Sequence, residues 1–214
     1  MKKAIVIGAT GMVGTRLIQS LIENDDYSEI VSFVRRASRI RNAKLSEHII
    51  NFDEPETWKK LVTGDVLFST LGTTIAQAKT KEEQYKVDFT YQYIVAKIAS
   101  ENGVAHYVLV SSAGANSNSK VFYSKMKGEL DDAVRSLPFK FISILRPGQL
   151  EGNRVNKRPT ERIALSVMHA MNKLGILRRY RPILDKQVAK AMINAASKLK
   201  SETYTLDEVF ELAD

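Results

Sequence analysis

Short apolar runs alternate along the chain with stretches in which apolar residues recur every three or four positions. A short apolar run is typical of a buried strand, and the longer repeat is typical of an amphipathic helix. The pattern predicts strands at 4–7, 30–34, 48–52, 65–70, 106–110 and 139–145. It predicts helices between them, most clearly at 15–23, at 81–100 and just after residue 120. This alternation favours an α/β protein with a doubly wound parallel sheet.

The pattern becomes less regular beyond residue 148, where it predicts a basic segment, helices ending near 172 and 198, and a short end from 204. With 214 residues and 44% hydrophobic content, the chain can bury a substantial core. We therefore expect one domain over 1–214, in which 149–214 form a small C-terminal elaboration on the substrate side of the sheet.

The first predicted strand ends in a glycine-rich turn, GATGMVG, and a helical pattern follows. A diphosphate needs a sharp bend and uncovered amides at a helix start, so Gly8 would make the bend and Gly11 would allow the close approach. Gly14 would allow the helix to pack closely on the strand. No Gly-Lys-Ser/Thr follows, which excludes a Walker A loop. The GxxGxxG spacing, with Ala9 in place of a second early glycine, points to a Rossmann domain of the short-chain dehydrogenase type.

The formal net charge of +8 calls for an anionic partner, which could be nucleic acid, an anionic surface or a phosphorylated small molecule. Arg35 and Arg36 follow the second strand, where NAD-binding domains carry an acidic residue for the ribose 2′-hydroxyl. Arginines there suit a 2′-phosphate, so the sequence favours NADP(H), although both could lie on a solvated loop. Further arginines and lysines at 154–162 and 178–181 could receive an acidic substrate or form a solvated surface. No nucleic-acid-binding motif accompanies them, which disfavours that class of partner.

The cysteine and histidine content limits the chemistry further. The chain has no cysteine, and its three histidines show no ligand spacing, so we expect no disulfide, thiolate site or structural zinc. It has no apolar run of about 18 residues, and glycines interrupt the apolar start, unlike a signal peptide. These features lead us to expect a soluble cytoplasmic protein without a membrane span.

The candidate catalytic residues follow the fifth predicted strand. Tyr123 and Lys127 stand four apart at the start of a predicted helix and therefore project from one face of it. A tyrosine hydroxyl has a pKa of about 10, and a lysine ammonium beside it favours the phenolate, so Tyr123 could exchange a proton with a substrate oxygen. Ser112 could bind the same oxygen. Lys125 lies two residues from Tyr123 and should point away from it. Asp53 either lies at the adenine or caps a helix.

Several motifs together resemble the atypical short-chain dehydrogenase/reductase family that includes the Tat-interactive-protein-like oxidoreductases. They are GATGMVG, DVLFSTLGTT, KVDFTYQYIV, HYVLVSSAGA, YSKMKGELD and LRPGQLEGNR, which span roughly 3–155. The resemblance implies Ser112, Tyr123 and Lys127 in the reductase positions. It also implies backbone contacts to the cofactor near Gly8, Gly11, Leu71, Gly72 and Pro147. With the positions discussed above and their neighbours, the candidate cofactor-binding residues are Gly8, Thr10, Gly11, Met12, Val13, Arg35, Arg36, Asp53, Leu71, Gly72, Thr73, Lys127, Arg146 and Pro147.

The sequence departs from the usual short-chain pattern at two positions. The turn after the fourth strand is LGTT rather than an Asn-Asn-Ala-Gly type turn, and Asp88 replaces an asparagine that organises a proton-relay water in the family. The sequence favours an NADPH-dependent oxidoreductase that reduces a small carbonyl or quinone-like substrate. The alternative is a non-catalytic NADP(H) redox sensor with a protein partner. The helix at 81–100 could form a homo-oligomer face or pack on the sheet.

Overall fold

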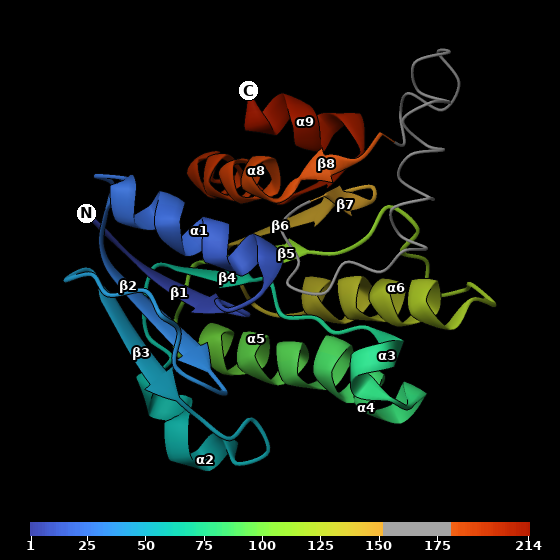
Figure 1. The fold of residues 1–214 in the computed structure, drawn as a ribbon, viewed down its shortest axis with the longest axis horizontal. Helices are drawn as coiled ribbons and strands as arrows, with labels where there is room; N and C mark the ends of the chain where they lie inside the picture. Colours follow the sequence, from blue (N-terminus) through green and yellow to red (C-terminus); the bar gives the residue numbers. More distant parts are fainter. Residues whose placement is uncertain (152–180) are drawn as a thin grey trace.

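A computed structural model describes residues 1–151 and 181–214 of the chain (Figure 1). In these residues the main sheet contains seven parallel strands in the order β3-β2-β1-β4-β5-β6-β9. The order reverses between β1 and β4, as it does in doubly wound nucleotide-binding folds. The strands are β1 Lys2–Ile7, β2 Tyr27–Val34, β3 Leu45–Ile49, β4 Val66–Ser69, β5 His106–Val110, β6 Phe141–Arg146 and β9 Glu202–Thr205.

Helices cover both faces of this sheet (Figure 1). Side chains alternate along a strand, so Ala4 and Val6 of β1 join the core beneath α1 (Met12–Glu23) and α8 (Asp185–Ser197). Ile5 and Ile7 join the core beneath α5 (Gln92–Glu101) and α6 (Phe122–Arg135). Burial on both faces explains the continuous apolar runs. The described helices are α1 Met12–Glu23, α2 Pro55–Trp58, α3 Ile75–Ala78, α4 Lys81–Tyr85, α5 Gln92–Glu101, α6 Phe122–Arg135, α8 Asp185–Ser197 and α9 Asp207–Ala213.

Two predicted elements differ from the structure. The third strand is Leu45–Ile49 rather than 48–52, because its register against β2 starts with Leu45 opposite Ile30. The helix expected at 81–100 is present, but α4 and α5 are joined by a π-helical segment at Lys86–Tyr91. We call Lys86–Tyr91 the π segment. A π-helical turn accommodates one extra residue and recurs at functional sites.

The described part of the C-terminal region completes the main architecture. Strand β9 pairs with β6 at the edge of the sheet, and α8 packs beside α1. A second, smaller sheet joins β7 Leu150–Glu151 to β8 Ile183–Leu184. The helix predicted to end near 172 and the basic residues at 154–162 and 178–180 lie outside the described residues. The assignment of 149–214 to the substrate side stays a prediction.

Candidate cofactor and active site

The glycine turn after β1 has the geometry expected from its sequence. Gly8 adopts a φ of +79°, and a Cβ atom there would lie 2.4 Å from the backbone nitrogen of Leu71. A Cβ atom on Gly14 would lie 2.1 Å from the carbonyl oxygen of Gly8. Gly8 therefore makes the bend, and Gly14 allows α1 to pack against the turn, as predicted. Gly11 is exposed, and its amide donates to Gly8 O over 2.9 Å.

The start of α1 is suited to an anion. Gly11 occupies the N-cap position and supplies no side-chain hydrogen bond, and the described first turn contains no acidic residue. The first amides of a helix have no partner within the helix, and the helix dipole makes this end positive. The amides of Met12 and Val13 are therefore suited to a diphosphate. Thr10 is exposed beside them, whereas Val13 contributes its side chain to the core.

The turn after β2 carries the arginines expected to select the cofactor. Arg35 and Arg36 are both exposed, and the described residues give neither of them an ion-pair partner. Glu47 of β3 instead holds the turn, because its carboxylate accepts the Ser38 amide over 3.0 Å. Arg41 folds back on the Ser38 carbonyl over 3.0 Å. Both predicted arginines are thus available to a phosphate at the carboxyl edge of the sheet.

The exit of β4 lies against β1 and against the π segment. Thr70 donates from Oγ1 to the Ile7 carbonyl over 2.9 Å, which joins the two strand ends. The amide of Thr73 donates to Asp88 Oδ1 over 2.7 Å. Leu71, Gly72 and Thr73 consequently have a fixed backbone at the edge where open parallel sheets bind their ligands.

Asp53 does not cap the helix that follows it. Glu54 occupies the N-cap position of α2, and the carboxylate of Asp53 instead pairs with Lys86 of the π segment, with 2.8 Å between Oδ1 and Nζ. The helix-cap interpretation is therefore wrong. The hydrogen bond from Lys86 lowers the pKa of Asp53, which is exposed. A contact between Asp53 and the adenine stays a prediction.

The predicted catalytic residues occupy the exit of β5 and the start of α6. Ser112 follows β5, and its backbone carbonyl oxygen accepts a hydrogen bond from the Ala115 amide over 2.9 Å. On α6 the side chains differ sharply in exposure, since Tyr123 is 41% exposed and Lys127 is 4% exposed. Lys125 is exposed and pairs with Glu129 at 3.8 Å, which agrees with its predicted orientation away from Tyr123.

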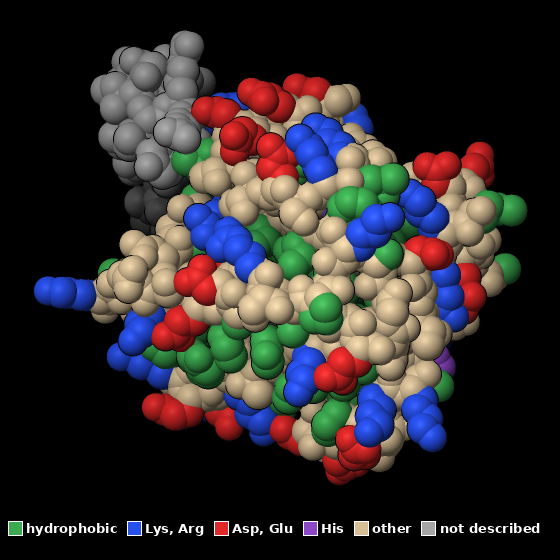
Figure 2. Space-filling model, turned by 180° about the vertical axis from the view of Figure 1, so that it is seen from behind, with side chains coloured by type: hydrophobic (Ala, Val, Ile, Leu, Met, Phe, Trp, Pro, Cys, Tyr) green, Lys and Arg blue, Asp and Glu red, His purple; other side chains and the backbone are tan. Residues whose placement is uncertain are grey.

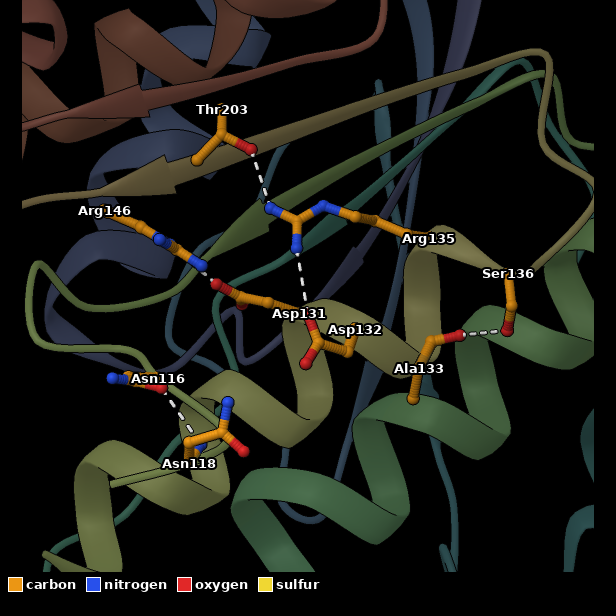
Figure 3. Close-up of polar contacts among 9 residues, drawn as sticks. All are labelled: Asn116, Asn118, Asp131, Asp132, Ala133, Arg135, Ser136, Arg146 and Thr203. Atoms are coloured by element: carbon orange, nitrogen blue, oxygen red, sulfur yellow. Dashed lines mark hydrogen bonds and ion pairs between the residues drawn. The ribbon is translucent and has the colours of Figure 1, made fainter. Parts of the chain in front are cut away.

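A buried ion pair beside these residues was not foreseen in the sequence. Asp131 is one further turn along α6 from Lys127 and is fully buried, and its Oδ2 accepts from Arg146 Nε over 2.8 Å (Figure 3). Burial raises the pKa of Asp131, although the hydroxyl of Ser111 and the charge of Arg146 favour its ionised form. The Nε atom of Arg146 is thus engaged by the protein itself. The four-residue spacing of Tyr123, Lys127 and Asp131 on one helix face was the available signal.

The surface charge and the positions of possible metal ligands bear on which partners the protein could bind. On the face in Figure 2, basic and acidic side chains are intermixed rather than separated into one basic surface. Within 1–151 and 181–214, no three His, Asp or Glu side chains form a group that could hold a metal ion. None of the helices in these ranges is long and apolar enough to cross a membrane.

Fold and site together define a class of protein, the Rossmann domains that bind a nicotinamide dinucleotide at the carboxyl ends of their strands. The chain belongs to the NAD(P)H-binding family, whose model matches residues 8–199. Protein fmp52 of Emericella nidulans is 36% identical over 207 residues, with 92% of this chain and 88% of the relative covered. FMP52 of Saccharomyces cerevisiae is 38% identical over 158 residues, with 72% and 68% covered.

Solved structures agree on the fold. The enzyme WbmH of Bordetella bronchiseptica, crystallised with NAD+, has a TM-score of 0.74 at 15% identity, with 96% of this chain and 75% of that chain covered. An ADP-L-glycero-D-manno-heptose-6-epimerase of Helicobacter pylori has a TM-score of 0.71 at 17% identity, with 96% and 76% covered. The prediction of a Rossmann fold that binds NAD(P)H is confirmed.

Two expectations are affected by these relatives. Both fmp52 relatives are named as mitochondrial proteins, so the expected cytoplasmic location is wrong. That expectation rested on the lack of a signal peptide and of a long apolar run, neither of which identifies a compartment. The narrower resemblance to the Tat-interactive-protein-like oxidoreductases stays a prediction.

Proposed function

We propose that the protein is an NADPH-dependent oxidoreductase of the atypical short-chain type, which transfers hydride to a small carbonyl or quinone-like substrate. The observation that carries the proposal is the arrangement on α6, where an accessible tyrosine lies one helical turn from a buried lysine. A reactive hydroxyl must reach the substrate, whereas the cation that tunes it acts most strongly away from water. Membership of the NAD(P)H-binding family supports the same function.

The cofactor would lie along the carboxyl edge of the sheet. The amides of Met12 and Val13, with Gly8, Thr10 and Gly11 beside them, would hold the diphosphate, and Arg35 and Arg36 would hold the 2′-phosphate of NADP(H). Asp53 would meet the adenine. Towards the nicotinamide, the contacts would come from Leu71, Gly72, Thr73, Lys127 and Pro147, with Arg146 contributing through atoms other than the Nε that binds Asp131.

The residues of α6 and of the β5 exit would supply the proton chemistry. When bound, NADPH would supply the hydride for the carbonyl carbon of the substrate. The Ser112 hydroxyl donates a hydrogen bond to the carbonyl oxygen and orients it. Tyr123 then transfers its hydroxyl proton to that oxygen, so the carbonyl becomes an alcohol, and the ammonium of Lys127 stabilises the remaining phenolate. Lys127 would also bind the nicotinamide ribose.

The test is NADPH binding followed by NADPH consumption with a panel of aldehydes, ketones and quinones. Tyr123→Phe should lower kcat/KM for a carbonyl substrate by about 10²- to 10⁴-fold and leave NADPH binding unchanged. Lys127→Ala should lower kcat/KM and weaken NADPH binding. Lys125 is an exposed lysine on the same helix, and Lys125→Ala should change neither quantity. Equal turnover by Tyr123→Phe would remove Tyr123 as proton donor. NADPH binding without turnover of any panel member would favour a redox sensor that acts through a protein partner.

A further inference from the structure

A buried chain of hydrogen bonds fastens the exit of β4 to the π segment. Ser69 at the end of β4 donates from Oγ to Gln92 Oε1 over 2.6 Å, and Gln92 Nε2 donates to the backbone oxygen of Asp88 over 2.7 Å. The carboxylate of Asp88 then accepts the Thr73 amide over 2.7 Å. Ser69 and Gln92 are completely buried, and Asp88 is 1% exposed. Because these groups are shielded from water, their hydrogen bonds hold the backbone in one arrangement.

The Asp88 carboxylate lies directly against the backbone that is proposed to meet the cofactor. A Cβ atom added to Gly72 would lie 3.1 Å from Asp88 Oδ1. The other oxygen, Oδ2, is 3.4 Å from Gln84 Nε2 on α4. A hydrogen bond from an amide to a carboxylate is about twice as strong as one between neutral groups. Asp88 is therefore the main anchor of the turn that contains Gly72 and Thr73.

The charge of the proposed catalytic lysine also acts on this carboxylate. The π segment packs against α6, and the charge of Lys127 favours the ionised form of Asp88, opposing the rise in its pKa that burial causes. Other charged side chains on the neighbouring elements have different partners. Lys86 pairs with Asp53, Lys125 pairs with Glu129, and Lys81 lies over the ring of Phe122.

We propose that Asp88 is a positioning residue of the active site, which holds the β4 exit in place for the cofactor. This inference rests on the proposed function. A turn that is already held in its binding arrangement loses less conformational freedom when the cofactor binds, so this anchor strengthens cofactor binding.

Asp88→Asn separates charge from geometry, since asparagine has the same shape and its oxygen can still accept the Thr73 amide. Asp88→Asn should therefore keep most of the NADPH affinity of the wild type. The matched control is Glu129→Gln, which removes a carboxylate from α6 that binds Lys125 and Tyr85. Its NADPH affinity should equal that of the wild type. An Asp88→Asn variant that binds NADPH as weakly as Asp88→Ala would overturn the role of the hydrogen bond to Thr73.

The measurement needs the cofactor but no substrate. If the wild type binds NADPH but turns over no substrate, the proposed function fails, and the NADPH affinities of the Asp88 variants still decide whether Asp88 holds the cofactor site.

The positioning role is tested by removing the hydrogen-bond acceptor. Asp88→Ala should weaken NADPH binding at least tenfold, whereas Asp88→Asn should weaken it by less. Equal NADPH affinity of Asp88→Ala and the wild type would overturn the role in holding the β4 exit. If Asp88→Ala fails to fold, Thr73→Pro, which removes the donated amide hydrogen and keeps the carboxylate, replaces it in the same measurement, with the same two outcomes.

Discussion

Arg146 at the end of β6 donates a hydrogen bond from Nε to Oδ2 of Asp131 on α6, with 2.8 Å between the two atoms (Figure 3). The carboxylate is fully buried, and the arginine side chain is 22% exposed. Since α6 carries Tyr123 and Lys127, this contact fixes the proposed catalytic helix relative to the sheet. The strand that supplies the arginine continues directly into Pro147, so one ion pair relates two parts of the site.

Loss of this ion pair should destabilise the fold. Arg146→Ala leaves a buried carboxylate without its cation, which is expected to lower the free energy of unfolding by about 3 kcal/mol. Arg135→Ala is the matched control, because Arg135 is exposed and pairs with Asp132 at 3.2 Å on the surface (Figure 3). It should cost about 1 kcal/mol or less. Urea unfolding at neutral pH measures both, and equal losses would contradict the structural role of the buried pair.

Substitutions of two glycines in the first turn should have separable effects. A methyl group on Gly14 would lie 2.1 Å from the Gly8 carbonyl, so Gly14→Ala must displace α1 and should cost on the order of 1–3 kcal/mol. On Gly11 the nearest atom would be 3.1 Å away, and the residue is exposed. Gly11→Ala should therefore weaken NADPH binding while thermal stability changes little. Comparable melting temperatures for the two variants would count against this assignment.

Cofactor selectivity should depend on the arginines after β2. Replacing Arg35 and Arg36 by alanine should raise the NADPH dissociation constant about ten- to hundredfold and leave that for NADH nearly unchanged, because NADH lacks the 2′-phosphate. Arg39→Ala removes another exposed charge from the same loop and serves as the control. Titrations by cofactor fluorescence measure these constants. A similar loss of NADPH and NADH affinity would remove the assignment.

His106 should make the fold sensitive to acid. It is 3% exposed, its Nε2 is 2.9 Å from Ser143 Oγ, and burial lowers its pKa from 6.5 to about 4. Below its ordinary pKa the unfolded chain binds a proton that the folded chain excludes, so stability falls as pH drops from 6.5 to about 4. The loss would be about 3 kcal/mol. His106→Phe should flatten this part of the stability curve, measured by urea unfolding, and parallel curves would refute the assignment.

The sequence by itself determined the class of fold and the order of its candidate site. Continuous apolar runs could be identified because strands such as β1 are buried on both faces, and glycines at positions 8 and 14 were informative because backbone geometry permits no other residue there. The spacing of Tyr123 and Lys127 placed both on one face of a helix. These are local properties, and a linear pattern records them.

The tertiary structure decided the features that depend on contacts between distant segments. The bounds of β3 follow from its register against β2, and the side chain of Asp53 has its partner on the π segment rather than at the start of α2. Neither the π segment nor the Arg146–Asp131 pair follows from periodicity, since a helix with one extra residue keeps nearly the same apolar pattern. The carboxylates of Asp88 and Asp131 are shielded from water because whole layers of the structure pack over them. No single stretch of sequence specifies that packing.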